Sequence, residues 1–302
     1  MKDHKLTGRD SLTISSGDLV ATVNPIGSEL SRLTFRESYD LLWNGDPAIW
    51  SGQAPILFPI VGMLVDGCYR LDDRSYEMPK HGFARTSTFK TIEHCQDTIV
   101  LRLETSPATR AIYPFEFRLD LTFQVAANLL SMRANISNLD DRSMPMSFGF
   151  HPAFRWPLPF GDTRSNHQIM FEAPEPAPVR RMNAQGLLLP DAKPTPVAGR
   201  TLMLRDSLFE DDALIFNALR SRRLTYGAPN APSLDITFEH LPDLGIWTKP
   251  GAGFIAIEPW QGYNDPVGFS GDFRDKPGVI QIAPGDARSF SMSVAVKDYD
   301  NE

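Results

Sequence analysis

Several features that mark other classes of protein are scarce or absent in this sequence of 302 residues. It has only two cysteines, Cys68 and Cys95, and they stand far apart with no zinc-type spacing. Free thiols in a reducing cytoplasm fit this better than a single disulfide. No apolar run approaches the ~20 residues of a membrane helix. Residues 1–5 are polar and lead into no apolar stretch, so we expect no secretory signal and a cytoplasmic protein.

Positive charge and the common cofactor motifs are missing as well. The formal net charge is −7 and no basic cluster is visible. This argues against nucleic acid and anionic membranes as partners. The sequence has no G-x-G-x-x-G, no P-loop and no nucleophile elbow. Its histidines and carboxylates never stand at zinc-ligand spacing, so we predict no catalytic metal and no cofactor.

What the sequence does have is alternation of apolar and polar residues. Over residues 115–125 every second residue is apolar, which is typical of a long half-buried strand. The same pattern recurs in residues 99–103, 130–136, 234–238 and 290–296. Helical periodicity is confined to two short stretches, residues 46–50 and 206–213. These patterns predict an all-β, antiparallel sandwich with a concave face, formed by residues 1–302 as one domain.

Proline is abundant, at 25 of 302 residues, and six prolines fall between positions 174 and 196. Strands of the same kind lie on both sides of this stretch, so we interpret it as a long arm of one domain. Loops of this length usually cover a site or pack on a neighbour.

One stretch combines a buried strand with a carboxylate. Residues 253–257 are apolar and partly β-branched, and they are followed by Glu258, Pro259 and Trp260. Proline has no N–H to donate, so we expect the strand to end at Pro259. A carboxylate at the end of a buried strand is costly unless it is paired or used. It is either a general base beside a sugar-stacking tryptophan or a strand-end residue that backbone amides satisfy.

Three further stretches differ from ordinary strands and turns. Residues 54–62 are apolar but contain two prolines, so we expect them at a sheet edge or lining a cavity. In residues 80–85, His81 precedes a glycine that permits close approach, and Arg85 supplies a fork of donors. His151 stands among three phenylalanines and a proline, where burial should lower its pKa and a nearby carboxylate should oppose that shift. Each stretch alone also fits a structural role.

Together and in this order, these stretches resemble the aldose 1-epimerase (mutarotase) superfamily, and most closely its bacterial LacX-like branch. The resemblance spans residues 19–296. Its motifs are His81-Gly82-Phe83-Ala84-Arg85, Gly149-Phe150-His151-Pro152 and Ile257-Glu258-Pro259-Trp260, together with residues 55–62, 209–216, 244–248 and 283–286. One departure stands out, because Met63 occupies a place where many relatives carry arginine.

The resemblance implies a β-supersandwich with a sugar site on its concave face. It implies that Glu258 is the general base and His151 the general acid. His81, Arg85, Asp212 and Trp260 would bind the sugar. The cation lost at Met63 is either missing from this site or replaced by Arg85.

The function that follows is that of an isomerase, interconverting the α and β anomers of a free hexose by acid–base ring opening and closure. Two alternatives stay open: a mutarotase for hexose 6-phosphates, and a non-catalytic carbohydrate-binding protein on the same scaffold. Because Met63 and residues 51–53 lack the cations that phosphosugar relatives carry there, we expect a neutral hexose. We expect a small sugar as partner, no nucleic acid and no membrane, with a homodimer left open.

Overall fold

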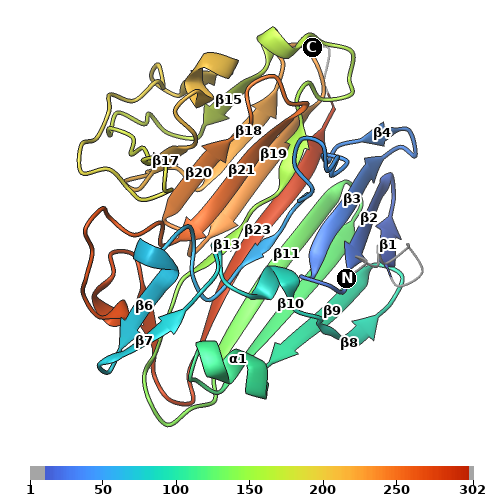
Figure 1. The fold of residues 1–302 in the computed structure, drawn as a ribbon. Coiled ribbons are helices and arrows are strands. Elements are labelled where there is room, and N and C mark those ends of the chain that lie inside the picture. The colour runs from blue at the N-terminus through green and yellow to red at the C-terminus, as the bar shows by residue number, and fades with distance from the viewer. Residues whose placement is uncertain (1–10, 299–302) are drawn as a thin grey trace.

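The computed structural model describes residues 11–298, which fold mainly into antiparallel strands (Figure 1). The polar residues 1–5 and the outer limits of the expected 1–302 domain lie outside this described range. The largest sheet has nine strands, in the order β16(Thr201–Met203), β15(Gln168–Phe171), β18(Arg223–Gly227), β19(Ser233–Glu239), β23(Ala287–Lys297), β11(Leu129–Asn138), β10(Phe117–Ala126), β9(Thr98–Glu104) and β8(Lys90–His94). It contains all five strands that the alternation predicted.

A second sheet of six strands carries the site described below. Its order is β17(Leu214–Phe216), β20(Asp243–Trp247), β21(Phe254–Gln261), β13(Phe148–Phe150) and β5(Ile56–Leu57), with β14(Ala153–Arg155) also paired to β21. β5 pairs only with β13, so residues 54–62 lie at the sheet edge as predicted. The smaller sheets are β1(Leu12–Ser16), β2(Leu19–Asn24), β3(Glu29–Phe35) and β4(Tyr39–Asp40); β6(Cys68–Leu71) and β7(Arg74–Glu77); and β12(Met144–Met146) and β22(Ile280–Ile282).

One continuous core joins the large sheets. Leu33 of the four-stranded sheet, Phe123 of β10 and Ile257 of β21 all belong to it. Phe148 of β13 stacks on Phe290 of β23, with ring centroids 5.1 Å apart. The apolar side chains that alternate along the strands thus fill the space between the sheets, as in a β-sandwich.

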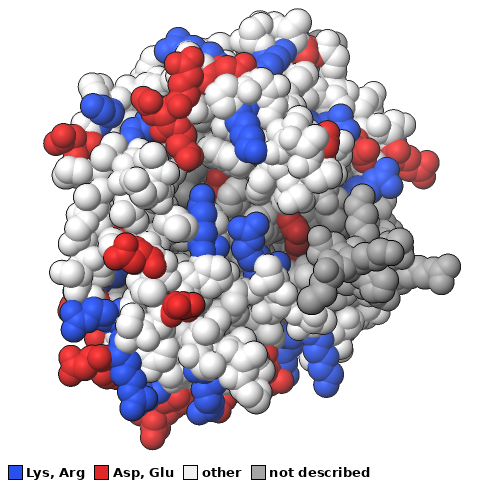
Figure 2. All heavy atoms as spheres, in the orientation of Figure 1, with Lys and Arg blue, Asp and Glu red and all other residues white. Residues whose placement is uncertain are grey.

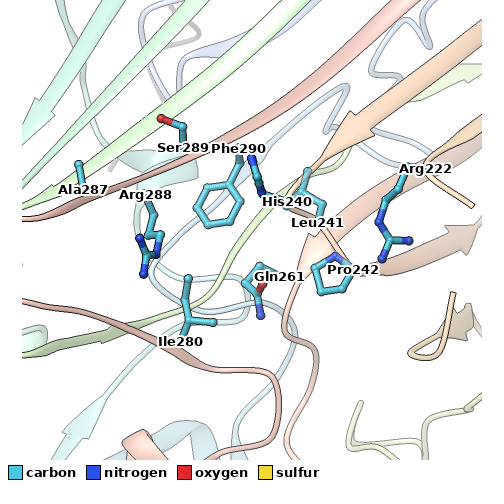
Figure 3. A pocket seen from close by; sticks show the side chains of 10 residues that line it. All are labelled: Arg222, His240, Leu241, Pro242, Gln261, Ile280, Ala287, Arg288, Ser289 and Phe290. Carbon is cyan, nitrogen blue, oxygen red and sulfur yellow. The ribbon is translucent and has the colours of Figure 1, made fainter. Parts of the chain in front are cut away.

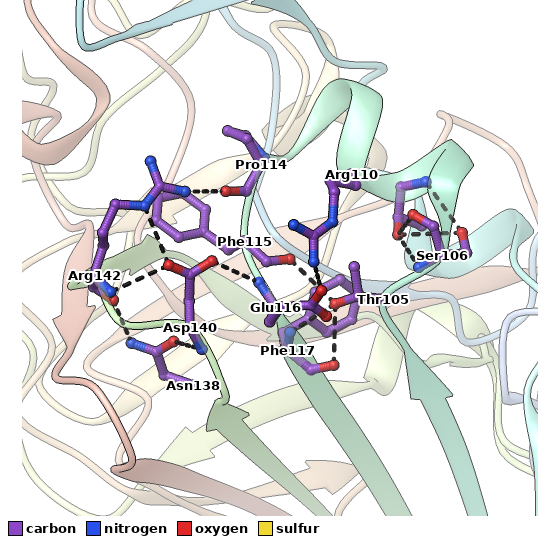
Figure 4. A network of polar contacts seen from close by, with 11 residues as sticks. Thr105, Ser106, Arg110, Pro114, Phe115, Glu116, Phe117, Asn138, Asp140 and Arg142 are labelled. Atoms are coloured by element: carbon purple, nitrogen blue, oxygen red, sulfur yellow. Dashed lines mark hydrogen bonds and ion pairs between the residues drawn. The ribbon is translucent and has the colours of Figure 1, made fainter.

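Helix is short throughout the described residues. The single α-helix is α1(Pro107–Ile112), which begins with a capping box formed by Ser106 and Thr109 and was not predicted. Beyond it, Asp140 accepts hydrogen bonds from the Glu116 amide and from the Arg142 side chain (Figure 4). The 3-10 turns are η1(Val65–Gly67), η2(Ala84–Thr86), η3(Arg164–Asn166), η4(Asp206–Phe209) and η5(Phe273–Asp275). No helix in residues 11–298 is long and apolar enough to cross a membrane.

Two other local predictions need correction. Residues 46–50 form a hydrogen-bonded turn and not a helix, and only the first half of residues 206–213 is helical, as η4. Each stretch is too short for a stable α-helix of its own, because nucleation is costly.

The prediction that the strand ends at Pro259 is also wrong, because β21 continues to Gln261. The N–H of Ile257 points toward Pro152, so the nitrogen of Pro259 points to the same side. On that side the neighbouring strand is broken between β13 and β14, and Phe150, which lies opposite Pro259, pairs with Ile56 of β5 and not with Pro259. The missing N–H of Pro259 therefore leaves no ladder bond unmade.

Both cysteines are free thiols. Cys68 is half-buried and Cys95 is exposed. This agrees with the expectation that they form no disulfide.

Candidate active site

His151 and Glu258 meet because of a break in one strand. β13 pairs Gly149 with Trp260, and β14 continues in the same register after a two-residue gap at His151 and Pro152. His151 therefore falls opposite Glu258, and its Nε2 lies 3.1 Å from the Glu258 Oε2. The other neighbour of Glu258, on β20, is Gly245, which places no side chain over the carboxylate.

Both members of this pair are almost fully buried, with side-chain exposures of 8% and 3%. Burial raises the pKa of Glu258 well above its ordinary range; the charge of Asp212 adds to the rise and Lys80 opposes it. Burial lowers the pKa of His151 to about 3, and the positive charges of Arg85 and Lys80 act in the same direction. The effect of burial thus outweighs the opposing effect expected from the carboxylate.

Because burial disfavours charge on both groups, it favours the pair with one proton and no net charge. A protonated carboxyl that donates to a neutral imidazole is the form that burial favours. Moving that one proton to Nε2 gives a carboxylate and an imidazolium, which are a base and an acid side by side. The His151 Nδ1 is buried and has no hydrogen-bond partner among residues 11–298.

His81 comes from a strained turn beside this pair. Its φ is +66°, and a Cβ at the following Gly82 would lie 2.1 Å from the Phe58 carbonyl oxygen, so only glycine fits there. The Gly62 N–H donates to the His81 Nδ1 at 3.1 Å. Because burial and the neighbouring cations lower the pKa of His81 well below its ordinary value, the ring is neutral. Its Nε2 therefore carries the hydrogen and can donate to a ligand.

Trp260 forms an apolar surface beside the pair. Two residues after Glu258 on β21, it points to the same face of the sheet. A Cβ at Gly149 would lie 2.5 Å, and one at Gly245 2.4 Å, from the indole ring, so the ring lies flat between two glycines. It packs with Leu188 and Ile215 in a small buried cluster.

The predicted site residues line one cavity of about 320 Å³, which is large enough for a small ligand. All six predicted residues contribute to it, namely Glu258, His151, His81, Arg85, Asp212 and Trp260. Asp212 is exposed and has a φ of +64°, and the Arg181 guanidinium holds its carbonyl oxygen at 2.8 Å. Figure 2 shows the molecular face over β20, β21 and β13 hollowed near its middle, with lysine or arginine side chains at the rim.

Sequence reasoning missed other residues of this cavity as ligand contacts. They are Trp50, Lys80, Met182, Ala213, Trp247, Lys249 and Asn264. A signal existed for two of them: tryptophan is uncommon, and Trp50 stands near, and Trp247 within, a motif that carries the resemblance. Lys249 follows a strand in an ordinary turn sequence, and nothing local distinguishes it.

Met63, in the place where an arginine was expected, does not line the cavity. A Cβ at Gly186 would lie 3.0 Å from its Cγ, so its side chain faces the proline-rich arm. Residues 80–85 bring two cations to the cavity, Lys80 and Arg85, and Lys249 adds a third from the loop after β20.

The proline-rich arm covers the site, which is one of the two roles predicted for it. It folds as an irregular hairpin, with Val179 and Lys193 bonded to each other through their backbones. It lies beside β17, through the bridge between Arg180 and Ile215 (Figure 1). Met182 of the arm lines the cavity, and the Asn264 side chain donates to the Gly186 carbonyl at 2.7 Å.

A larger cavity, of about 530 Å³, lies elsewhere, where Gln261 of β21 meets the first half of β23. Figure 3 shows Arg288 and Arg222 at its two ends, with the Phe290 ring between them. No carboxylate lines it, so it offers no carboxylate–imidazole pair. Within residues 11–298 no group of three or more His, Cys, Asp or Glu side chains is arranged to hold a metal ion.

Comparison with known proteins identifies the family. Protein LacX (chromosomal) of Lactococcus lactis subsp. lactis is 29% identical over 288 residues, which cover 92% of this chain and 96% of that protein. A galactose mutarotase related enzyme from Lactobacillus acidophilus superposes with a TM-score of 0.88 at 27% identity, covering 97% of this chain and 99% of that one. A galactose mutarotase-like protein from Lactobacillus casei gives the same TM-score and identity over 95% of this chain and all of that one. The aldose 1-epimerase family model matches residues 10–292. The chain therefore belongs to the aldose 1-epimerase family, in its LacX-like branch.

Proposed function

We propose that this protein is an aldose 1-epimerase that interconverts the α and β anomers of a free hexose. The observation that carries the proposal is the His151–Glu258 pair, 3.1 Å apart at one cavity. Family membership supports the same class of isomerase.

The reaction needs one proton taken from the anomeric hydroxyl and one given to the ring oxygen. In the carboxylate–imidazolium form, Glu258 takes the O1 proton while His151 protonates O5, and the ring opens to an aldehyde. This leaves the carboxylic acid and the neutral imidazole, which is the form that burial favours. After rotation about C1–C2 the two transfers run in reverse and close the ring on the other face. The pair keeps one net proton throughout, so no net charge is created in a buried site.

The remaining residues of the cavity suit sugar binding. The His81 Nε2–H can donate to a hydroxyl, and Asp212 and Arg85 offer an acceptor and donors at the rim. The flat indole of Trp260 suits stacking on an apolar sugar face.

The test is Glu258→Gln, which keeps the shape of the side chain and removes the base. We expect the rate of α/β interconversion, followed by polarimetry, to fall by two or more orders of magnitude while sugar binding measured by calorimetry survives. The matched control is Asp243→Asn, which alters another buried carboxylate of the same sheet outside the cavity, and it should retain activity. Near-full activity in Glu258→Gln would reduce Glu258 to a structural residue. Sugar binding by a wild-type protein that gives no acceleration would favour the carbohydrate-binding alternative.

A hexose 6-phosphate is the second candidate substrate, and one observation favours it. Lys80 and Arg85 line the cavity and have no ion-pair partner among the described residues, and Lys249 adds a third cation. A phosphate with about −1.5 to −2 charges would satisfy such groups. The sequence around Met63 and the net charge of −7 favour the neutral hexose. We therefore expect kcat/KM for glucose to exceed that for glucose 6-phosphate. A tenfold preference for the phosphate that weakens with added salt would reverse the order.

A further inference from the structure

Trp50 is placed against the candidate acid by several independent contacts. It ends the turn of residues 46–50, where its N–H donates to the Asp46 carbonyl at 2.8 Å. Its own carbonyl accepts the Trp43 indole N–H at 2.8 Å, and Lys249 donates to the carbonyl of Ile49. A Cβ at Gly52 would lie 2.5 Å from the Trp50 ring, so glycine is needed for this packing. The turn is therefore held from the loop after β20 as well as from its own segment.

The indole of Trp50 stacks on the imidazole of His151. Their ring centroids are 5.2 Å apart and their planes differ by 29°. Trp247 meets Trp50 edge-on, with centroids 5.4 Å apart, and also meets His151 edge-on at 6.1 Å. Trp50 is half-exposed at the cavity. One face of its indole contacts the His151 imidazole and shields it from water.

An aromatic face within about 6 Å of a cation attracts it, and tryptophan does so most strongly. The imidazolium form of His151 is such a cation, whereas the neutral imidazole is not. The charged or titratable groups that face His151 are Glu258 on β21, His81, Lys80 and Arg85 on the segment before and within η2, and Asp212 and Lys249 across the cavity. Among these, only Glu258 contacts the imidazole as an ion-pair partner, and two of the cations oppose its protonation.

We propose that Trp50 is a positioning residue for the acid–base pair: its stacked indole fixes the His151 imidazole opposite Glu258 and stabilises the imidazolium–carboxylate form. Burial favours the neutral form of the pair, and Trp50 counteracts that preference on the partner that must become positively charged. Trp50 thereby raises the share of molecules in the reactive form. The kinetic part of this proposal rests on the proposed epimerase function.

The first experiment compares Trp50→Leu and Trp50→Phe by anomer exchange. A cation–aromatic contact of this kind corresponds to about a 3- to 30-fold change in an equilibrium. We expect Trp50→Leu to lower kcat by that factor with KM changed less than twofold, and Trp50→Phe, which keeps an aromatic face, to recover most of the loss. A tenfold rise in KM at unchanged kcat would overturn the proposal, since Trp50 would then be only a platform for the sugar.

Two further variants separate this effect from misfolding. Trp43→Phe removes the hydrogen bond to the Trp50 carbonyl without altering the cavity lining, and it should lower kcat by a smaller factor with KM unchanged. Trp156→Phe makes the same exchange at a buried tryptophan outside the cavity and should leave kcat as it is. Equal losses in these two variants would mean that kcat follows general stability, which contradicts the proposal.

The second experiment needs no turnover, so it stands even if the protein proves not to be an epimerase. The ring ¹⁵N shifts of His151, assigned by their loss in His151→Asn, report the charge state of the imidazole as the pH is lowered from 7. Because burial keeps the imidazole mainly neutral at pH 7, we expect the imidazolium form to appear at a lower pH in Trp50→Leu than in the wild type, and Trp50→Phe to restore the wild-type value. Identical shifts in the wild type and Trp50→Leu would overturn the stabilising role of Trp50.

Discussion

β10 and β21 are both central strands of their sheets, yet they bury their side chains differently. In β10 buried residues alternate with half-buried or exposed ones, and its polar face carries groups such as Asp120, which pairs with Arg102 at 2.6 Å. In β21 the seven residues from Phe254 to Trp260 are all buried. Ile255 and Ile257 face the core between the sheets, while the alternate residues face the cavity, the arm and the Trp50 turn.

The difference shows how one architecture can supply both stability and chemistry. A carboxylate on the open face of β10 keeps water and cations around it. A carboxylate on the covered face of β21 or β20 loses that solvation, so its pKa rises and it can exchange a proton near neutral pH. The regular sheet should therefore tolerate change on one face only, and the covered sheet should show pH-dependent stability.

The largest effect on stability is expected from the core face of β10. Phe123 is fully buried in the main cluster, so Phe123→Ala removes a ring and leaves a cavity. We expect the free energy of unfolding to fall by about 3–5 kcal/mol, measured by chemical denaturation. A loss below 1 kcal/mol would mean that β10 is not central to the core.

Asp243 of β20 tests the covered sheet. Burial raises its pKa to about 6 from an ordinary 3.8, although the Gly262 N–H and the charge of Arg222 oppose the rise. The folded protein then binds more protons than the unfolded chain between these values, so stability falls as the pH rises from about 4 to 7. That loss is about 3 kcal/mol for this group.

The variant Asp243→Asn keeps an acceptor for Gly262 and cannot ionise. Its free energy of unfolding relative to the wild type should therefore increase by about 3 kcal/mol between pH 4 and pH 7, from denaturation curves at several pH values. If the difference in free energy of unfolding between Asp243→Asn and the wild type does not change with pH, folding does not raise the pKa of Asp243.

The smallest effect is expected one residue from Phe123, on the exposed face of β10. Gln124 is exposed, and Gln124→Ala should change the free energy of unfolding by less than about 0.5 kcal/mol in the same assay. A loss comparable to that of Phe123→Ala would contradict the two-faced description of β10.

The regular sheet was predictable because its information is local. The alternation in residues 115–125 and 290–296 places strands correctly, since one apolar face requires a period of two. β21 was less predictable. Its covered second face hides the alternation, and its course through Pro259 depends on a gap in a neighbouring strand that lies some hundred residues away in the sequence.

By itself, the sequence determined the β class, the exclusion of residues 54–62 from a central ladder and, through its motifs, the six side chains that share the cavity. Only the tertiary structure decided how they meet. The register of β13 and β14 puts His151 opposite Glu258, burial favours the one-proton form of the pair, and the turn of residues 46–50 brings Trp50 onto the imidazole. The physical reason is that register, burial and stacking depend on residues far apart in the chain, which no local pattern encodes.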